Sequence, residues 1–211
     1  MGRIEELCAL IDPCESFADV GCDHGYCARH VLKSGKCGDV LITDISAKCL
    51  AKAEKLLQEY IAAGKCRAVC CDGLAGVPEN CGQVLIAGMG GEEIIKILSE
   101  RFIPEKFILQ PMKNADKLRK FLIDRGCKIT YDGIFRDEKF YFVIKGERSG
   151  GNAGYSPAEL AFGKDSIGGG VLKEYARSEL EKYNDRLKKC VDENQREKIM
   201  DTIKLLTEVL Q

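Results

Sequence analysis

Short apolar segments alternate with amphipathic ones along most of the chain, and this alternation predicts strands and helices in turn. Ile4, Leu7, Leu10 and Ile11 recur at helical spacing, and Pro13 ends that first helix. The expected strands are Phe17–Val20, Val40–Ile42, Cys66–Cys70, Val84–Ala87, Phe107–Leu109, Lys128–Phe135 and Phe140–Lys145. The expected helices among them are Tyr26–Lys33, one from the N-cap Ser46 to about Tyr60, Glu92–Ser99 and Ala115–Asp124.

Repeated strand–helix units predict an α/β fold, in which helices cover both faces of a doubly wound, mostly parallel sheet. The last two strands are separated by only four residues, at 136–139. A link that short permits only an antiparallel hairpin. We therefore expect a seven-stranded Rossmann-like sheet that carries one antiparallel strand near its end.

The pattern changes after residue 148. Residues 149–170 are rich in glycine and read as a connector of hinge or loop type. Two apolar stripes at helical spacing follow, one from Leu172 to Val191 and one from Ile199 to Leu210, with a polar turn at Asp192–Gln195 between them. We expect a Rossmann-like domain at 1–148, the glycine-rich connector at 149–170 and an antiparallel, coiled-coil-like helical hairpin at 171–211.

Composition narrows the class of protein. The 211 residues are 45% hydrophobic and 31% charged, with a net charge of -1, so the chain is globular and lacks the basic excess typical of many RNA-binding proteins. The first ten residues contain no apolar signal segment, and no apolar run reaches membrane-spanning length. We expect a cytoplasmic protein, without membrane contact, whose 12 cysteines are reduced and mostly serve as small core residues.

The segment Asp19–Gly25 carries the most chemical information. It follows a strand and opens a helix, where free backbone N–H groups face a ligand. Asp23 stands where a dinucleotide-binding loop would have its second glycine, and Asp19 adds another negative charge. Acidic groups repel a diphosphate but suit a sulfonium or an amino group. This loop therefore favours a positively charged ligand such as S-adenosylmethionine.

Two further strand ends carry an acidic residue. Asp44 ends the second strand, 19 residues past Gly25, where a carboxylate can accept both ribose hydroxyls of a nucleoside. Asp72 follows the third strand and can accept from an adenine amine, while Leu74 covers the ring. The alternative is that Asp19, Asp44 and Asp72 only form turns. All three in the right order make a nucleoside site the better interpretation.

The segment Asp19–Tyr26, with the sequence DVGCDHGY, resembles the D-[IV]-G-[ST]-D-H-[AG]-Y signature of the TrmK type of tRNA (adenine-N1)-methyltransferases, which act on position 22. Three later stretches agree, namely Asp72–Leu74, Ile86–Gly91 and Leu109–Pro111, and Glu159–Gly163 resembles the E-L-x-F-G of the same family. The resemblance spans nearly the whole chain. The departures from the pattern are Cys22, Cys27–Ala28, Asp44 and Lys164.

The resemblance implies a bacterial class I methyltransferase that moves a methyl group from S-adenosylmethionine to N1 of an unpaired or flipped adenine in tRNA. The implied catalytic residues are Asp23, His24, Tyr26 and Gln110. Of these, Asp23 would stabilise charge, His24 and Tyr26 would stack on the base, and Gln110 would read its edge. The implied cofactor-binding residues are Asp19, Gly21, Cys22, Gly25, Asp44, Ile45, Asp72, Gly73, Leu74, Gly88, Met89 and Gly90.

Other interpretations remain open. A methyltransferase of the same fold could act on a small molecule or a protein, the chain could bind a nucleotide without catalysis, and an NAD-dependent oxidoreductase is the most distant alternative. The cluster Cys22, His24, Cys27 and His30 imitates a metal site, but a loop that holds a cofactor cannot point all four at one centre, so we expect no metal. We expect a monomer or a weak homodimer.

Two basic groups are candidates for contacts with the tRNA body. The first lies on the C-terminal hairpin and consists of Lys182, Arg186, Lys188 and Lys189. The second follows the fifth strand and consists of Lys113, Lys117, Arg119 and Lys120. For the second group a solvated helix face is the preferred interpretation.

Overall fold

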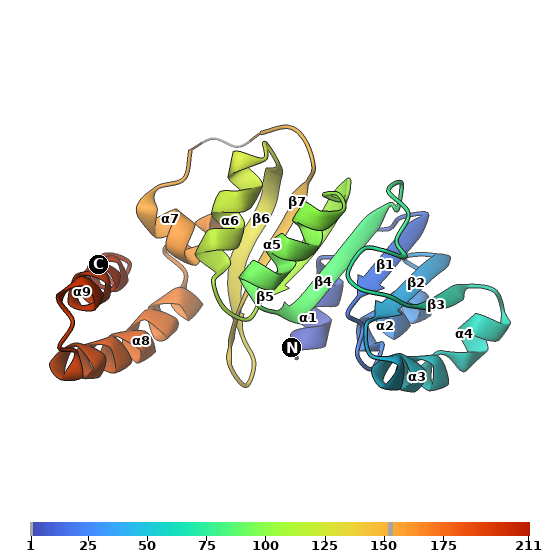
Figure 1. The fold of residues 1–211 in the computed structure, drawn as a ribbon, viewed down its shortest axis with the longest axis horizontal. Helices are drawn as coiled ribbons and strands as arrows, with labels where there is room; N and C mark the ends of the chain where they lie inside the picture. Colours follow the sequence, from blue (N-terminus) through green and yellow to red (C-terminus); the bar gives the residue numbers. More distant parts are fainter. Residues whose placement is uncertain (1, 152–153) are drawn as a thin grey trace.

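A computed structural model describes residues 2–151 and 154–211 of the chain. Its centre is a twisted seven-stranded sheet with strand order β3-β2-β1-β4-β5-β7-β6 (Figure 1). The strands are β1 (Ser16–Val20), β2 (Asp39–Asp44), β3 (Cys66–Cys70), β4 (Gln83–Met89), β5 (Lys106–Pro111), β6 (Lys128–Arg136) and β7 (Phe140–Glu147). Each strand lies where the apolar pattern predicts one, and most gain one to three residues at their ends.

Strands β1 to β5 pair in parallel, whereas β7 pairs antiparallel with both β5 and β6. The expected α/β fold, a mostly parallel sheet of seven strands with one antiparallel strand, is therefore confirmed. Strand β1 lies between β2 and β4, so the direction of winding reverses there. In such sheets the carboxyl ends on either side of the reversal form a crevice for ligands.

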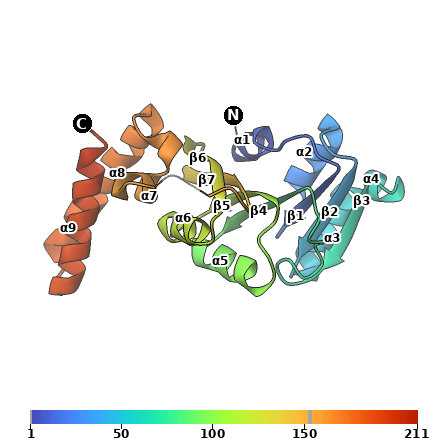
Figure 2. The ribbon, with the colours of Figure 1, turned by 90° about the horizontal axis from the view of Figure 1, so that it is seen from above.

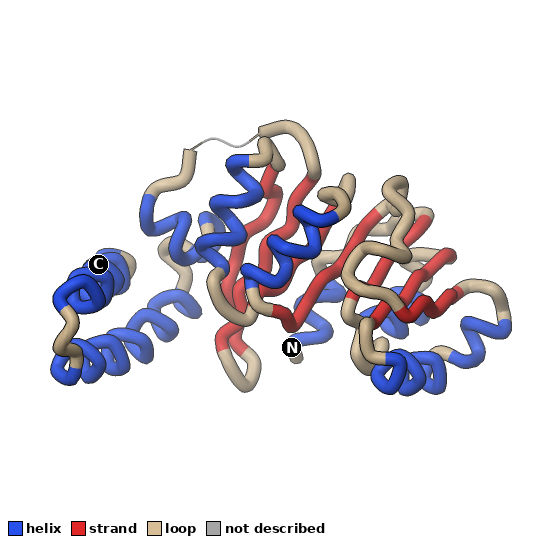
Figure 3. Tube along the Cα trace, viewed as in Figure 1, coloured by secondary structure: helices blue, strands red, loops and turns tan. Residues whose placement is uncertain are grey.

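Helices cover both faces of the sheet (Figures 2 and 3). One face carries α1 (Arg3–Ala9), α2 (Tyr26–Ser34) and α3 (Ala47–Leu56), and the other carries α5 (Gly91–Glu100) and α6 (Ala115–Asp124). The helix expected to run unbroken to about Tyr60 is interrupted at Leu57, and α4 (Gln58–Ala62) follows. Leu57 is fully buried against Gly25 at the start of α2, and this contact fixes the bend.

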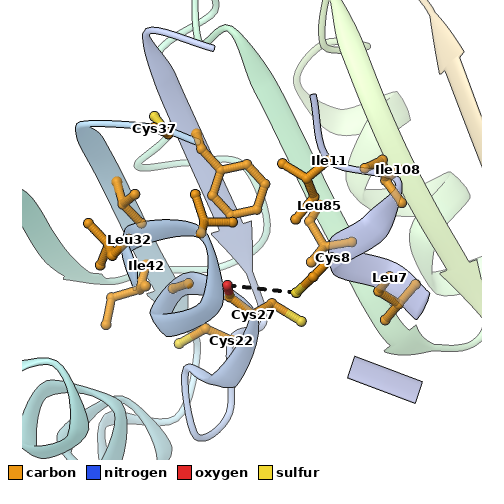
Figure 4. Packing of buried hydrophobic residues seen from close by; sticks show 14 of the residues in the cluster. Leu7, Cys8, Ile11, Cys22, Cys27, Leu32, Cys37, Ile42, Leu85 and Ile108 are labelled. Carbon is orange, nitrogen blue, oxygen red and sulfur yellow. Dashed lines mark hydrogen bonds between the residues drawn. The ribbon is translucent and has the colours of Figure 1, made fainter. Parts of the chain in front are cut away.

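The core on the α1–α3 face contains several cysteines among its aliphatic residues (Figure 4). Cys8 on α1 and Cys27 on α2 are buried side by side, and the Cys8 thiol points at the Cys27 carbonyl oxygen at 4.0 Å. All cysteines of the described residues are free thiols. The expectation that most of them pack as small hydrophobic residues agrees with this arrangement.

The C-terminal part holds α7 (Pro157–Phe162), the 3₁₀ turn η1 (Lys164–Ser166), α8 (Gly170–Lys189) and α9 (Glu193–Glu208). Helices α8 and α9 pack together as the expected hairpin, at the end of the molecule opposite α4 (Figure 1). The stretch interpreted as a loop contains α7. Ser156 and Glu159 form a capping box around Pro157, and this local signal outweighs the surrounding glycines.

A buried ion pair fastens α7 to the sheet domain. Arg119 on α6 and Asp132 on β6 are both fully buried, and the Arg119 Nε lies 2.8 Å from each carboxylate oxygen. The Arg119 Nη1 donates to the carbonyl oxygens of Leu160 and Ala161 at 3.2 and 3.0 Å. The interpretation of Arg119 as part of a solvated face is therefore wrong, because its charge is matched inside the protein.

Candidate functional site

A cavity of about 520 Å³ opens at the carboxyl ends of β1, β2 and β4. Its volume falls in the range of small-molecule sites, and its position is the crevice where the winding reverses. Most of the residues predicted to bind a ligand line it. They are Asp19, Gly21, Cys22, Asp23, His24, Tyr26, Asp44, Ile45, Asp72, Gly73, Gly88 and Met89.

Backbone hydrogen bonds hold the loop between β1 and α2 in shape. Gly21 and Cys22 donate their N–H groups to the Thr43 carbonyl oxygen at 2.8 and 2.9 Å. Gly21, Asp23 and Gly25 have φ values of 68°, 47° and 73°, a left-handed conformation that favours glycine. A Cβ atom on Gly21 would collide with the Met89 side chain. The backbone conformation therefore favours glycine at position 21, and any side chain there would also displace the end of the Met89 side chain.

Backbone N–H groups fix the carboxylates of Asp19 and Asp44. Asp19 Oδ2 accepts the Ala28 N–H at 3.1 Å, near the start of α2. Asp44 Oδ2 accepts the Asp23 N–H at 3.0 Å, and its Oδ1 accepts the Ser46 N–H at 2.8 Å. Both side chains are buried, at 5% and 8% exposure, so they present oriented acceptors to the cavity.

Burial controls the protonation of Asp19. It raises the pKa of this carboxyl to about 7, although the Ala28 N–H and the charge of Arg3 oppose the shift. The carboxyl of Asp44, which lies nearby, adds a repulsion that also raises the pKa. A cation placed beside Asp19 would relieve this cost, since it would favour the ionised form.

Arg3 is the one lysine or arginine among the described residues that line the cavity. It starts α1, its backbone N–H donates to Asp137 at 2.9 Å, and its guanidinium lies over the Tyr141 ring at 5.5 Å. The Arg3 Nε donates to Gln110 Oε1 at 2.9 Å, and Nη2 faces Gly88, where a Cβ would come within 3.0 Å of it. The cavity thus has one fixed cation among its acidic groups.

Gln110 does not line the cavity. Its side chain is fully buried beneath Arg3, and its amide nitrogen donates to the Pro111 carbonyl oxygen at 3.3 Å. Its amide oxygen accepts from Arg3, and the predicted contact between Gln110 and the edge of a base stays a prediction. The Gln110 side chain orients the Arg3 guanidinium.

Three other predicted ligand residues lie behind the cavity wall. Gly25 packs against Ala53 of α3, where a Cβ would come within 3.0 Å of that side chain. Leu74 is 1% exposed in the core beneath α5, and Gly90 is the N-cap of α5. These residues shape the site from outside it.

The mouth of the cavity carries an aromatic pair. The rings of His24 and Tyr26 are stacked, with centroids 5.6 Å apart and an angle of 10° between their planes. Tyr26 is 52% exposed. His24 Nδ1 lies 2.8 Å from Asp23 Oδ2, and this contact is the main cause that lowers the pKa of the Asp23 carboxyl. Asp23 is therefore ionised at neutral pH, beside a flat surface open to solvent.

Several lining residues were not predicted from the sequence. Four cysteines, Cys22, Cys27, Cys49 and Cys71, line the cavity, of which only Cys22 was expected there. Arg3 lies just before an apolar pattern that signals a helix, but nothing local reveals that this helix crosses the strand ends. The described residues contain no group of three or more His, Cys, Asp or Glu side chains arranged to hold a metal ion. Within the same residues, no helix is long and apolar enough to cross a membrane.

Comparison with known proteins shows which proteins share this sequence and fold. Residues 1–144 match the family model described as "Methyltransferase domain". A Mycoplasma pneumoniae protein named "Putative tRNA methyltransferase" is 31% identical over 135 residues, which are 62% of this chain and 62% of that protein. The matched region thus spans less than two thirds of this curated relative.

Two solved structures superpose over nearly the whole chain. A Streptococcus pneumoniae protein described as "a putative tRNA (m1A22) methyltransferase" gives a TM-score of 0.90 at 26% identity, covering 100% of this chain and 99% of that one. The structure of that protein in complex with S-adenosyl-L-methionine gives a TM-score of 0.87, also at 26% identity, covering 99% and 98%. These relatives share the C-terminal hairpin region as well as the sheet.

Proposed function

This chain belongs to the methyltransferase domain family, and from that premise we propose that it transfers a methyl group from S-adenosylmethionine to N1 of an adenine in tRNA. The family resemblance of the Asp19–Tyr26 loop suggests position 22 as the target. The observation that carries the proposal is the charge pattern of the cavity. Carboxylates end three neighbouring parallel strands and one arginine lies across from them, which suits a nucleoside with an amino-acid tail.

The residues present fit S-adenosylmethionine. Gly21 and Gly88 line the cavity, and the ends of the Met89 and Arg3 side chains pack where their Cβ atoms would lie. Asp44 is oriented to accept the ribose hydroxyls through its remaining lone pairs, and Asp72 lies where it would accept the adenine amine. Asp19 would pair with the ammonium group and Arg3 with the carboxylate, so the two ends of the tail would each meet an opposite charge.

The bound cofactor would supply a methyl group on a positively charged sulfur. The N1 atom of a neutral adenine already carries an in-plane lone pair, so the protein needs no general base, and positioning dominates the rate. The product base carries the positive charge. Asp23 is ionised at the mouth of the cavity, where its carboxylate would stabilise that charge as it develops.

Access to N1 requires an unpaired or flipped adenine, because N1 lies on the Watson–Crick edge. The stacked rings of His24 and Tyr26 offer the extruded base a flat partner beside the cavity. Base–aromatic stacking of this kind contributes about 1–3 kcal/mol. Gln110 acts one step back from the substrate, since it orients Arg3.

We further propose the three-part organisation expected from the sequence, with the sheet domain at 1–148, the connector at 149–170 and the hairpin at 171–211. A cytoplasmic location and a monomer or weak homodimer complete the proposal. Size-exclusion chromatography with light scattering measures the last point directly.

The test is mass spectrometry of nucleosides from unmodified tRNA incubated with the purified protein and S-adenosylmethionine. We expect 1-methyladenosine, and we expect Asp23→Asn to lower kcat about tenfold, a modest loss because the Asp23 side chain is exposed and screened. Asp116→Asn, which removes an exposed carboxylate of α6 away from the cavity, is the matched control. Methyl incorporation that survives RNase would instead assign the protein a protein or metabolite substrate. A wild-type protein that binds NADH but not S-adenosylhomocysteine would refute the cofactor.

A further inference from the structure

The outer surfaces of α2 and α3 carry two rows of cations that start beside the cavity mouth. Arg29 and Lys33 are exposed on α2 and lie four residues apart, so they share one side of that helix. Lys48, Lys52 and Lys55 are exposed on α3 at spacings of four and three residues, so they share one side as well. We name these five residues the α2–α3 face.

The α2–α3 face holds an excess of positive charge in a chain whose net charge is -1. Helices α2, α3 and α4 contain only Glu54 and Glu59 as acidic residues. None of the five cations forms an ion pair with any described residue. Unpaired cations on one side of a nearly neutral protein form the electrostatic footprint that a polyanion recognises.

Three of these cations converge on one hollow. Arg29 and Lys33 from α2 and Lys55 from α3 line a depression of about 250 Å³. Leu56, Gln58, Glu59 and Tyr60 complete it, so the hollow holds three cations beside one carboxylate. The cations outnumber the carboxylate, and an anion in the hollow would therefore meet a net positive charge.

The face is continuous with the mouth of the cavity. Lys52 Nζ lies 3.4 Å from His24 Nε2, so the α3 row passes directly beside the aromatic pair. Helix α2 begins at Tyr26, and the preceding Gly25 packs on Ala53 of α3, which holds the two rows together. Lys48 and Lys55 are separated by about 10 Å along the helix axis, at 1.5 Å per residue.

Five of the eight basic residues predicted to contact the tRNA body are ion-paired. On the opposite side of the sheet, Lys117 pairs with Glu92 and Lys120 pairs with Asp124, while Arg119 is buried. On the hairpin, Lys182 and Lys188 pair with acidic residues of their own helix, at 2.6 and 3.0 Å. Lys113, Arg186 and Lys189 form no ion pair with any described residue. The α2–α3 face is distinguished from them by its contact with the aromatic pair at the cavity mouth, through Lys52 and His24.

We propose that the α2–α3 face binds phosphates of the RNA strand that leads to the adenine at the cavity mouth. The proposal rests on tRNA being the substrate. A row of this length can follow the backbone of one RNA strand, so that its lysines neutralise successive phosphates. The α2–α3 face would contact the RNA backbone, so it would contribute to tRNA affinity and to the position of the strand without recognising its base sequence.

The experiment compares two triple variants of the full chain. Arg29→Gln/Lys33→Gln/Lys55→Gln removes the cations of the hollow. Lys96→Gln/Lys120→Gln/Arg148→Gln is the matched control, because it removes one arginine and two lysines that are exposed and ion-paired elsewhere. Calorimetry with S-adenosylhomocysteine and thermal unfolding show that each variant is folded with an intact cavity.

Binding of unmodified tRNA is measured by filter binding between 50 and 200 mM salt. We expect the α2–α3 variant to raise Kd at least about tenfold at low salt and to make the slope of log K against log salt shallower by roughly two to three, with kcat at saturating tRNA retained. We expect the control to keep the slope and the affinity to within about twofold.

If the α2–α3 variant binds tRNA with the affinity of the wild type and with the same slope of log K against log salt, the proposal is overturned. An equal loss in both variants also overturns it, because the effect would then follow net charge and not this face. If the wild-type protein binds S-adenosylhomocysteine but neither binds nor methylates tRNA, the proposed function fails first, and the two failures are distinguished.

Discussion

Replacing Asp19 with asparagine is expected to stabilise the ligand-free protein while weakening its binding of S-adenosylmethionine. The carboxyl of Asp19 is 5% exposed, and its burial raises the pKa to about 7 from the ordinary 3.8. Between these two pH values the unfolded chain releases the proton while the folded chain retains it. The stability of the wild type therefore falls as pH rises from about 4 to 7, and above pH 7 the full cost of the buried charge is present.

The size of this cost follows from the difference in pKa. About three pH units at 1.36 kcal/mol each give roughly 4 kcal/mol above pH 7. Asparagine keeps an oxygen for the Ala28 N–H, but its buried amide also needs an acceptor, which offsets about 1–2 kcal/mol. We expect the free energy of unfolding of Asp19→Asn to be about 2–3 kcal/mol higher than that of the wild type at pH 8, and about 1–2 kcal/mol lower at pH 4, where the carboxyl is protonated in the folded wild type.

Urea unfolding of both proteins at pH 4, 5, 6, 7 and 8 measures this difference, with Asp116→Asn as the control for removal of an exposed carboxylate. Calorimetry at pH 8 measures the other half of the prediction, a loss of at least about tenfold in affinity for S-adenosylmethionine, since the ammonium loses its charged partner. If Asp19→Asn is less stable than the wild type at pH 8, or if the difference does not change with pH, the buried charge is not the cost that we assign to it.

Three further variants test other parts of the structure. Arg119→Leu leaves Asp132 as an unpaired buried charge and should cost about 3–5 kcal/mol in urea unfolding; adding Asp132→Asn should recover part of the loss, and no recovery would contradict this cause. Gly21→Ala places a methyl group against Met89 at a φ of 68° and should weaken S-adenosylhomocysteine binding at least about tenfold by calorimetry, so unchanged affinity would refute the steric argument. Tyr26→Ala should lower methyl transfer to tRNA about tenfold with cofactor affinity retained, whereas Tyr26→Phe should keep the activity, because stacking needs only the ring.

The sheet and its helices were predictable because the signals are local. Strands such as β4 are short apolar runs, and α2 ends at Gly35, which adopts the left-handed conformation expected of a C-terminal glycine. The meeting of Asp19 with Asp44 also follows from the sequence, since both end parallel strands that pair with each other. Parallel pairing brings such ends to one edge of the sheet whatever the rest of the fold does.

Arg3 and Gln110 show where sequence reasoning stops. Arg3 reaches the cavity because α1 crosses the strand ends. Its contact with Gln110 joins residues 107 positions apart in the sequence, and no local pattern encodes such a contact. Gln110 lies near the end of its strand as expected. Side chains alternate between the two faces of a strand, however, and the Gln110 amide oxygen accepts a hydrogen bond from Arg3. Position at a strand end indicates the edge of a sheet, whereas orientation depends on the partners around it.

The cysteines of the cavity wall are potential targets for methylation by the protein's own cofactor. A sulfonium cofactor is an alkylating agent, and a thiolate is a far better nucleophile than the ring nitrogen of a base. Burial, together with the nearby carboxylates of Asp19 and Asp44, raises the pKa of the Cys22 thiol well above its ordinary range, and contact with Cys8 and burial do the same for Cys27. Under the proposed function, the acidic groups that attract the methyl donor would also keep these two sulfurs protonated, and the protein would thereby avoid methylating its own cavity wall.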